Sequence, residues 1–99
     1  MSQPSVIIEY TKKAFKERNA LTANEKAILD ALEQDLRETA GKPFARGWKS
    51  LGELRGQGLM HCHLTYRTVA IWDVEEHGTE IKIVLCRFEY IGKRGKAPY

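Results

Sequence analysis

Apolar residues at the start of the chain follow first a strand pattern and then a helix pattern. Residues 6–10 are β-branched or aromatic except for one glutamate, which is typical of a short strand. Thr11 can cap a short helix that ends near Asn19, a residue able to adopt a left-handed conformation. We expect this helix to turn Ala14 and Phe15 toward the interior.

A second helix is predicted to begin at residue 22. Thr22-Ala23-Asn24-Glu25 has the form of a capping box. The apolar residues that follow have the spacing of one helical face: Ala27, Ile28, Ala31, Leu32 and Leu36. Glu33 and Arg37 would form an i,i+4 pair on the polar side, and Gly41 and Pro43 would end the helix. Such a helical hairpin needs a sheet to cover its apolar face.

The rest of the chain has the spacing of strands, except for a glycine-rich loop over residues 44–58. After this loop one strand face carries Met60, Cys62, Leu64 and Tyr66, and the other carries His61, His63, Thr65 and Arg67. Residues 68–74 are apolar on both faces, as in a central strand, and residues 75–79 predict a hairpin turn to a partner strand over 81–91. The order strand, helix, helix, strand, strand, strand predicts one α+β domain over residues 1–99.

Composition favours a globular protein, with 42% hydrophobic and 29% charged residues. No apolar run approaches the roughly 20 residues that cross a bilayer, and no secretory signal begins the chain, so we expect a cytoplasmic protein without a membrane partner. A reducing compartment would keep Cys62 and Cys86 as thiols, although a disulfide is the less favoured alternative.

Positive charge is concentrated in two segments. The net charge is +3, and residues 46–67 and 84–99 each carry three more basic than acidic side chains, whereas residues 73–82 carry three fewer. If the two basic segments meet in space, they would attract a polyanion; a solvated mixed surface is the alternative that charge alone leaves open.

Three side chains on the polar face of the 59–67 strand could carry chemistry. His61, His63 and Arg67 would all point away from the core. Histidine suits proton transfer near neutral pH, and arginine grips phosphate in two-pronged geometry. His63 and Arg67 would be roughly 13 Å apart on an ideal strand, unless a bulge or turn near Tyr66 shortens the gap.

Two other interpretations of the histidines stay open. Both side chains could be merely solvated on an exposed strand. A metal site is opposed by strand geometry, because Cys62 would point to the other face and Cys86 lacks Cys-x-x-Cys spacing. We therefore predict no metal site and no cofactor.

The glycine-flanked tail could complete the same face. Arg94 could approach it from the last strand, and Tyr99 offers a ring for stacking on an unpaired base, although a frayed terminus is the alternative. There is no phosphate-cradling glycine loop, nucleophile elbow or carboxylate pair suited to a metal nuclease. Any hydrolytic chemistry would therefore depend on basic and aromatic side chains.

Two segments and the order of elements resemble the RelE/ParE toxin superfamily over nearly the whole chain. The segments are Tyr66-Arg67-Thr68-Val69-Ala70-Ile71-Trp72 and Ile91-Gly92-Lys93-Arg94 through Tyr99. His61-Cys62-His63-Leu64 is similar to the histidine-bearing strand of the YafQ branch, whereas Gly92-Lys93-Arg94 is more similar to RelE. The resemblance implies a RelE-like fold, in which an N-terminal strand and a helical hairpin pack on a small, mostly antiparallel twisted sheet.

The resemblance also implies an activity. It is that of a type II toxin–antitoxin toxin which cleaves mRNA on the ribosome without a metal ion, by attack of a ribose 2′-hydroxyl on the neighbouring phosphate. Arg67 would stabilise the phosphorane, Arg94 would assist the leaving oxygen or the phosphate, and His63 would be the base. Tyr99 would orient the substrate, although its spacing from Arg94 differs from both RelE and YafQ. The candidate RNA-binding residues are Lys49, Arg55, His61, Arg87, Lys93 and Lys96.

Two alternatives to the nuclease remain within the same fold. A ParE-like toxin would inhibit DNA gyrase by binding alone, and a non-catalytic member would bind RNA without cutting it. Either toxin implies a cognate antitoxin with a segment that folds on binding, and the toxin could be a dimer within that complex.

Overall fold

In the part of the chain that the structure describes, a five-stranded sheet and two helices form the domain. The computed structural model describes residues 5–40, 48, 52–53, 59–79 and 82–97. The elements are β1 (Ser5–Tyr10), α1 (Lys12–Asn19), α2 (Ala23–Glu38), β2 (Gly52–Glu53), β3 (Leu59–His63), β4 (Thr68–His77), β5 (Ile83–Lys93) and the 3-10 turn η2 (Arg94–Lys96). The predicted α+β class and order of elements are confirmed, with the short β2 added inside the segment expected to be a loop.

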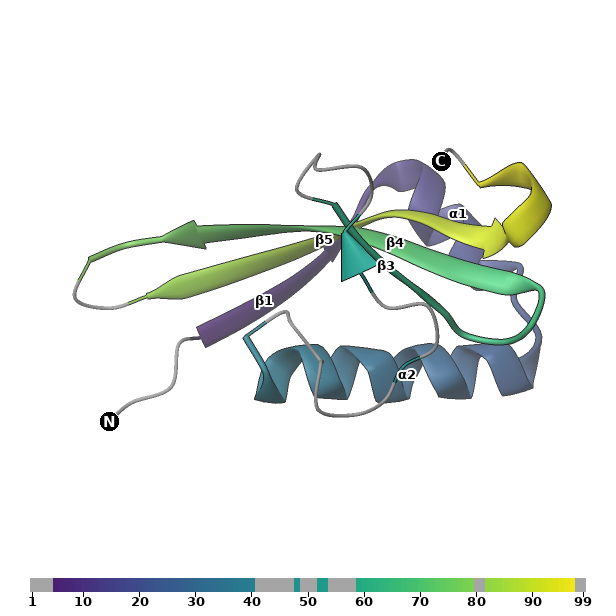
Figure 1. The fold of residues 1–99 in the computed structure, drawn as a ribbon, viewed down its shortest axis with the longest axis horizontal. Coiled ribbons are helices and arrows are strands. Elements are labelled where there is room, and N and C mark those ends of the chain that lie inside the picture. Colours follow the sequence, from purple (N-terminus) through teal and green to yellow (C-terminus); the bar gives the residue numbers. More distant parts are fainter. Residues whose placement is uncertain (1–4, 41–47, 49–51, 54–58, 80–81, 98–99) are drawn as a thin grey trace.

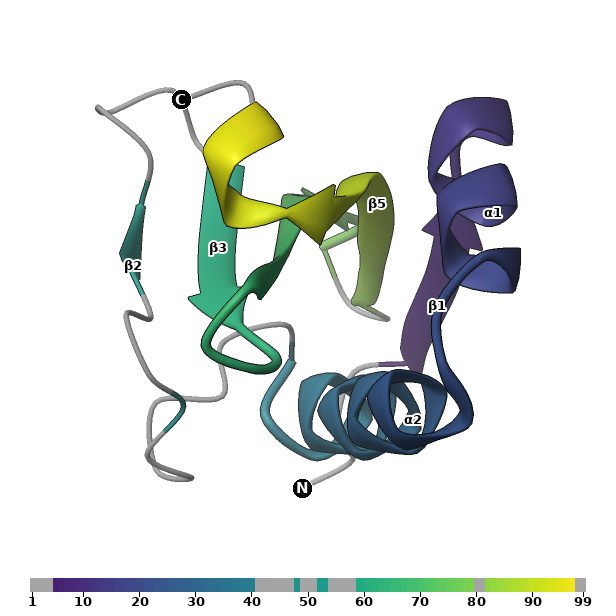
Figure 2. The same ribbon diagram turned by 90° about the vertical axis from the view of Figure 1, so that its right-hand side faces the viewer.

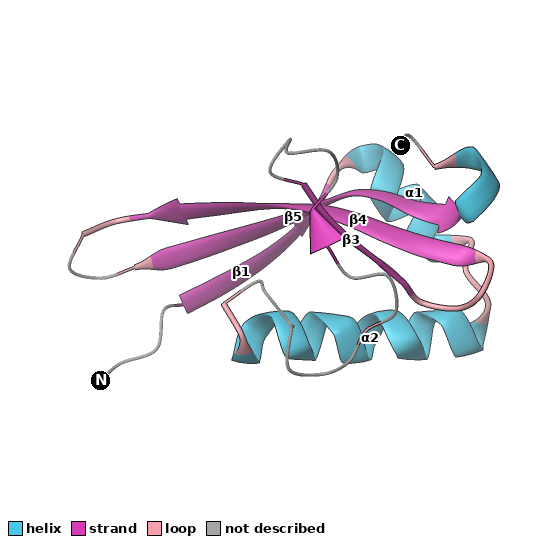
Figure 3. Cartoon of the chain, viewed as in Figure 1, coloured by secondary structure: helices cyan, strands magenta, loops and turns pink. Residues whose placement is uncertain are grey.

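The sheet is mixed and twisted. Its strand order is β1-β5-β4-β3-β2, and β1 runs parallel to β5 whereas the other neighbours are antiparallel (Figures 1 and 3). Strand β5 therefore joins the N-terminal strand to the rest of the sheet. Among the described residues, no helix is long and apolar enough to cross a membrane.

Both helices begin at the residues that the sequence indicates. The Thr11 hydroxyl group accepts a 3.0 Å hydrogen bond from the Ala14 nitrogen. The capping box is present in full, because Thr22 and Glu25 each accept a hydrogen bond from the other's backbone nitrogen. The predicted left-handed end at Asn19 is wrong, since Asn19 ends the helix without a positive φ and Ala20 follows in a right-handed conformation.

The buried face of α2 is rotated from the predicted one. Helix α2 lies under the sheet (Figure 1), where Leu29, Leu32 and Leu36 are fully buried while Ala27 and Ala31 are exposed. Alanine is compatible with the buried or the exposed face of a helix. Burial of the larger Leu29 against the sheet removes more apolar surface from water.

Two predictions about helix side chains need correction. Ala14 is buried as expected, but Phe15 is 52% exposed, because α1 lies beside β5 and β1 and turns only one side to the core (Figure 2). The Glu33 carboxylate is not paired with Arg37 but accepts a 2.6 Å hydrogen bond from the Tyr10 hydroxyl group. Tyr10 thereby fastens β1 to α2, and its burial is the main cause that raises its pKa.

The alternation predicted for β3 holds until the strand ends. Met60, Cys62 and Leu64 are buried in the core shared with the helices. The chain then turns, so Tyr66 is 78% exposed rather than on the core face. On the outer face a smaller cluster forms around Val69, Ile71 and Tyr90, with Leu59 and Ala97 against it.

Strand β4 is buried on both faces from Thr68 to Trp72, as predicted for a central strand. A bulge in its partner β5 at Glu89 changes the alternation there, since Ile71 pairs with Tyr90 and Trp72 with Phe88. The bulge lets Phe88 and Ile91 both enter the main core while Tyr90 faces outward.

Three turns meet at one end of the sheet, on the right of Figure 1. They are the α1–α2 connection, the β3–β4 turn and η2. In the β3–β4 turn the Thr65 hydroxyl group accepts hydrogen bonds from the nitrogens of Arg67 (3.3 Å) and Thr68 (3.2 Å). At the opposite end the β4–β5 hairpin turns at Gly78, whose φ of 92° suits glycine.

Candidate functional site

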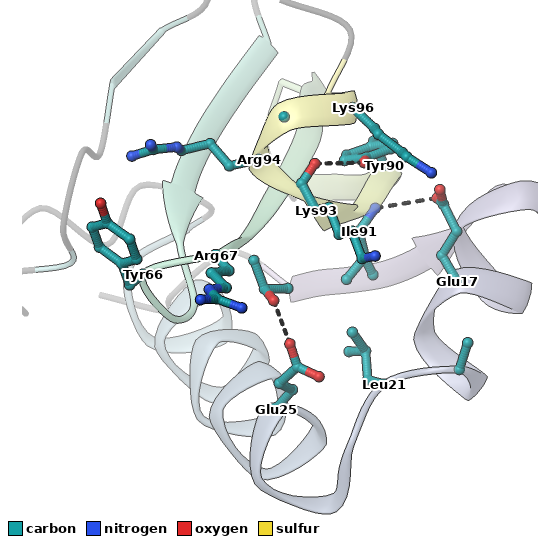
Figure 4. Close-up of a pocket in the computed structure, with 14 residues that line it drawn as sticks. Glu17, Leu21, Glu25, Tyr66, Arg67, Tyr90, Ile91, Lys93, Arg94 and Lys96 are labelled. Atoms are coloured by element: carbon teal, nitrogen blue, oxygen red, sulfur yellow. Dashed lines mark hydrogen bonds between the residues drawn. The ribbon is translucent and has the colours of Figure 1, made fainter.

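A pocket of about 950 Å³ lies where the three turns meet (Figure 4). The two helices and the connection between them contribute Glu17, Ala20, Leu21 and Glu25. The β3–β4 turn and the start of β4 contribute Tyr66, Arg67 and Thr68. The end of β5 and η2 contribute Tyr90, Ile91, Gly92, Lys93, Arg94, Gly95 and Lys96. Segments far apart in the sequence therefore share one concave surface.

The cations of the pocket are available to an external anion. Arg67, Lys93, Arg94 and Lys96 are all exposed, and none of them forms an ion pair with a carboxylate of the described residues. Arg67 of the first basic segment thus lies in one pocket with Lys93, Arg94 and Lys96 of the second. An unpaired cluster of guanidinium and ammonium groups is suited to phosphate.

The two carboxylates of the pocket are already engaged by the fold. Glu17 accepts a 3.2 Å hydrogen bond from the Ile91 nitrogen and lies 3.6 Å from the Lys13 ammonium group. Glu25 accepts hydrogen bonds from the Thr68 hydroxyl group and the Thr22 nitrogen. These bonds, first the one from Thr68, lower the pKa of Glu25. Both carboxylates thus tie the helical hairpin to the sheet.

The two arginines of the pocket are held close by backbone structure. The Arg94 nitrogen donates a 2.7 Å hydrogen bond to the Arg67 carbonyl oxygen. The Arg94 guanidinium lies 5.2 Å from the centre of the Tyr66 ring. Figure 4 shows the side chain of Arg94 extending toward Tyr66, with Arg67 beside it. Arg67, Arg94 and Tyr66 therefore form one edge of the pocket.

The two histidines do not line this pocket. His61 pairs with Ile71 and His63 with Val69, so both imidazoles lie on the outer face of β3. Burial, and then the neighbouring His63, lower the pKa of His61. The chain turns between His63 and Arg67, and the pocket lining includes Arg67 and Arg94 but not His63. Its role as a base stays a prediction.

The remaining predicted residues divide into three groups. Lys93 and Lys96 line the pocket. Arg87 lies away from it on β5, where it pairs with Glu9 at 3.4 Å. Lys49, Arg55 and Tyr99 lie outside the described residues. All of their functional roles stay predictions.

Sequence reasoning missed Tyr66, Glu17 and Glu25 as residues of the pocket. Tyr66 carried one signal, its position directly before Arg67, but its place in the alternation assigned it to the core. The contacts of Glu17 and Glu25 join segments distant in sequence, and no local pattern indicates them.

The cysteines and potential metal ligands form no further site within the described segments. Cys62 and Cys86 are free and fully buried, and burial raises their thiol pKa values to about 12 and about 11. No group of three or more histidine, cysteine or acidic side chains in the described part of the chain could hold a metal ion.

Comparison with known proteins identifies the fold. No protein-family model matches the sequence, and comparison with curated proteins finds no significant match. A solved structure, the YoeB/ParE toxin from Agrobacterium tumefaciens, is similar with a TM-score of 0.60 and 20% sequence identity, over 84% of this chain and 98% of that chain. The RelE/ParE-like fold that the sequence resemblance implied is confirmed.

Proposed function

From the RelE/ParE-like fold, we propose that the protein is the toxin of a type II toxin–antitoxin pair and cleaves mRNA on the ribosome. The observation that carries this proposal is the meeting of Arg67 and Arg94 at a pocket whose four cations have no carboxylate partner among the described residues. A phosphodiester fits such a pocket, because its charge matches guanidinium groups presented from two turns.

The proposed reaction is the one that the resemblance to the RelE/ParE superfamily implies, and the charge of the pocket supports it. The 2′-oxygen of a ribose bonds to the adjacent phosphorus while the bond from phosphorus to the 5′-oxygen breaks, which leaves a cyclic phosphate and a 5′-hydroxyl group. Arg67 and Arg94 would stabilise the extra negative charge of the phosphorane. A base takes the 2′-hydroxyl proton, and an acid returns a proton to the leaving oxygen. His63 is the candidate base, and Lys93 and Lys96 would hold the flanking phosphates.

A cell-free translation assay with purified protein tests the proposal. The wild type should cleave ribosome-bound mRNA at discrete positions, and Arg67→Ala and Arg94→Ala should each slow cleavage by about 100-fold or more. Arg37→Ala is the matched control, since it removes an exposed guanidinium from α2 outside the pocket. His63→Ala separately tests the base. Full cleavage by both pocket variants would refute the proposed mechanism.

A second candidate is inhibition of DNA gyrase by binding alone. It is favoured by one observation, that no histidine lines the pocket. A supercoiling assay with purified gyrase separates the two functions, because a nuclease leaves supercoiling unchanged. If supercoiling is blocked and mRNA stays intact, the gyrase inhibitor replaces the nuclease.

Either toxin implies a cognate antitoxin in the same cytoplasm. We expect a small acidic protein with a segment that folds over the basic pocket and the helical hairpin, within a complex in which the toxin can be dimeric. Co-expression with the product of the adjacent gene and co-purification test this. Loss of the interaction in high salt would support the expected charge complementarity.

A further inference from the structure

We propose that Tyr66, with the Arg94 guanidinium beside its ring, is a binding site for one unpaired nucleobase at the edge of the phosphate-binding pocket. This inference rests on the proposed function, since it takes RNA to be the substrate. It adds a site for a nucleobase to a pocket whose charge fits phosphate. The residue that supplies this site, Tyr66, was not among the site residues predicted from the sequence.

The exposure of the Tyr66 ring is the first observation. Tyr66 is 78% exposed, whereas the next most exposed large apolar side chain of the described residues, Phe15, is 52% exposed. The ring contributes nothing to either hydrophobic cluster, and its hydroxyl group has no hydrogen bond within the described residues. An exposed aromatic side chain outside the hydrophobic clusters, at a concave, charged surface, is suited to a ligand with an aromatic face.

The backbone around Tyr66 is held in place on both sides. The Thr65 hydroxyl group accepts hydrogen bonds from the two residues that follow Tyr66. The Leu64 nitrogen donates a 2.8 Å hydrogen bond to the Thr68 carbonyl oxygen, and the Arg94 nitrogen bonds to the Arg67 carbonyl oxygen. The ring is therefore presented from a fixed turn, so a base that stacks on it does not also have to order the backbone.

The neighbours of the ring supply the chemistry for a nucleotide. Arg94 lies 5.2 Å from the ring centre, a distance at which cation and ring attract each other. A guanidinium plane and a phenol ring are both surfaces on which bases stack. Arg67 follows Tyr66 directly in the chain and can bind the phosphate attached to the same nucleotide. The subsite thus fits a base and its phosphate together (Figure 4).

The arrangement favours an unpaired strand over a duplex, without strong base preference. Bases within a duplex are stacked on each other and cannot cover a side chain, whereas an unpaired base can. Each base has an aromatic face, so stacking alone tolerates all four. Codon or base preference would have to come from other groups.

The test compares two short single-stranded RNAs in a fluorescence-anisotropy titration, one intact and one with every base removed. Replacement of the ring in Tyr66→Leu should weaken binding of the intact strand by about tenfold and leave binding of the abasic strand unchanged. Tyr66→Phe keeps the ring and should bind both strands as the wild type does. Arg67→Ala should weaken binding of both strands, because both carry the phosphates.

Two controls separate stacking from a structural effect. Phe15→Leu makes the same kind of change at an exposed aromatic residue outside the pocket and should leave both affinities unchanged. The melting temperature of Tyr66→Leu should equal that of the wild type, since the ring is exposed.

The outcomes distinguish this inference from the function on which it rests. If the wild type binds RNA and Tyr66→Leu binds the intact strand equally well, or loses equal affinity for both strands, the base subsite is wrong while RNA binding stands. If the wild type binds neither strand and cleaves no ribosome-bound mRNA, the base subsite and the proposed function are both wrong.

Discussion

The backbone nitrogen of Arg94 donates a 2.7 Å hydrogen bond to the carbonyl oxygen of Arg67. This bond extends the β4–β5 ladder one step beyond the pair of Thr68 with Lys93. The two arginines are therefore brought together by backbone pairing and not by contacts of their side chains. Substitution of either side chain should leave the other in place, so single variants report on the chemistry of the pocket.

The rate of mRNA cleavage should depend on whether position 67 carries arginine or lysine. Arg67→Lys keeps the charge but loses the planar fork that binds two phosphate oxygens at once, so the single-turnover rate of mRNA cleavage should fall by about tenfold or more. Arg37→Lys on α2 is the matched control and should cleave at the wild-type rate. A wild-type rate for Arg67→Lys would show that charge alone suffices.

A side chain larger than that of glycine at position 92 should destabilise the fold while Tyr90 is present. A Cβ atom there would lie 2.9 Å from the Tyr90 hydroxyl oxygen and 3.1 Å from the ring carbon that bears it. The Tyr90 hydroxyl group is held by a 2.8 Å hydrogen bond to the Lys93 carbonyl oxygen, so the ring cannot move without losing that bond. Gly92→Ala should cost about 1–3 kcal/mol in the free energy of unfolding, measured by urea denaturation.

The double variant with Tyr90→Phe checks the cause of this loss. It removes the nearest atom, so Gly92→Ala should cost less in the Tyr90→Phe background than in the wild type. Equal costs in the two backgrounds would rule out the clash with the hydroxyl group.

The stabilising effect of Glu25 should disappear in acid. Its hydrogen bonds with Thr68 and Thr22 lower the folded-state pKa, so the stabilisation is complete above the unfolded-state value of about 4.3 and is lost as the pH falls through the folded-state value. Glu25→Ala should cost about 1 kcal/mol at neutral pH.

Thermal unfolding of the wild type and Glu25→Ala, at neutral pH and at about pH 3, measures this difference. The gap between the two melting temperatures should narrow in acid. Thr68→Val removes the hydroxyl donor and keeps the Glu25 carboxylate. The difference between its melting temperature and that of the wild type should also be smaller in acid, though by less than for Glu25→Ala. A gap that is constant with pH would show that the ionised carboxylate of Glu25 is not the source of the stabilisation.

Both cysteines should be unreactive in the folded protein. Cys62 and Cys86 are fully buried, and their raised pKa values of about 12 and about 11 leave little thiolate near neutral pH. Ellman's reagent should therefore modify neither thiol in buffer and both in guanidinium chloride. Rapid modification of the native protein would indicate local opening of the core.

The parts of the fold that depend on residues close together in the sequence were predictable. The capping box of Thr22 and Glu25 fixes the start of α2 through local hydrogen bonds, and the alternation of Met60 and Cys62 fixes the core face of β3. The buried face of α2 was only partly predictable. Leu29 and Ala27 both fit a helix, and only contact with the sheet decides which one is buried.

The candidate site was likewise predictable only in part. The sequence indicated Arg67 and Arg94 as a pair, and they do line one pocket. It also grouped His63 with Arg67, either on one strand or across a turn near Tyr66. The chain does turn after His63, and Arg67 lines the pocket whereas His63 does not. Where a strand ends depends on its partners across the sheet, which local alternation does not reveal.

The position of β5 between β1 and β4 has a consequence for synthesis. The first strand pairs with a strand that is made much later in translation, as in the Glu9–Arg87 contact, which spans 78 positions of the chain. Until residues 83–93 have left the ribosome, β1 has no strand to pair with and the arginine pocket lacks one wall. The nascent chain therefore cannot complete the pocket until β5 has been made, although β1 and both helices precede it in the chain.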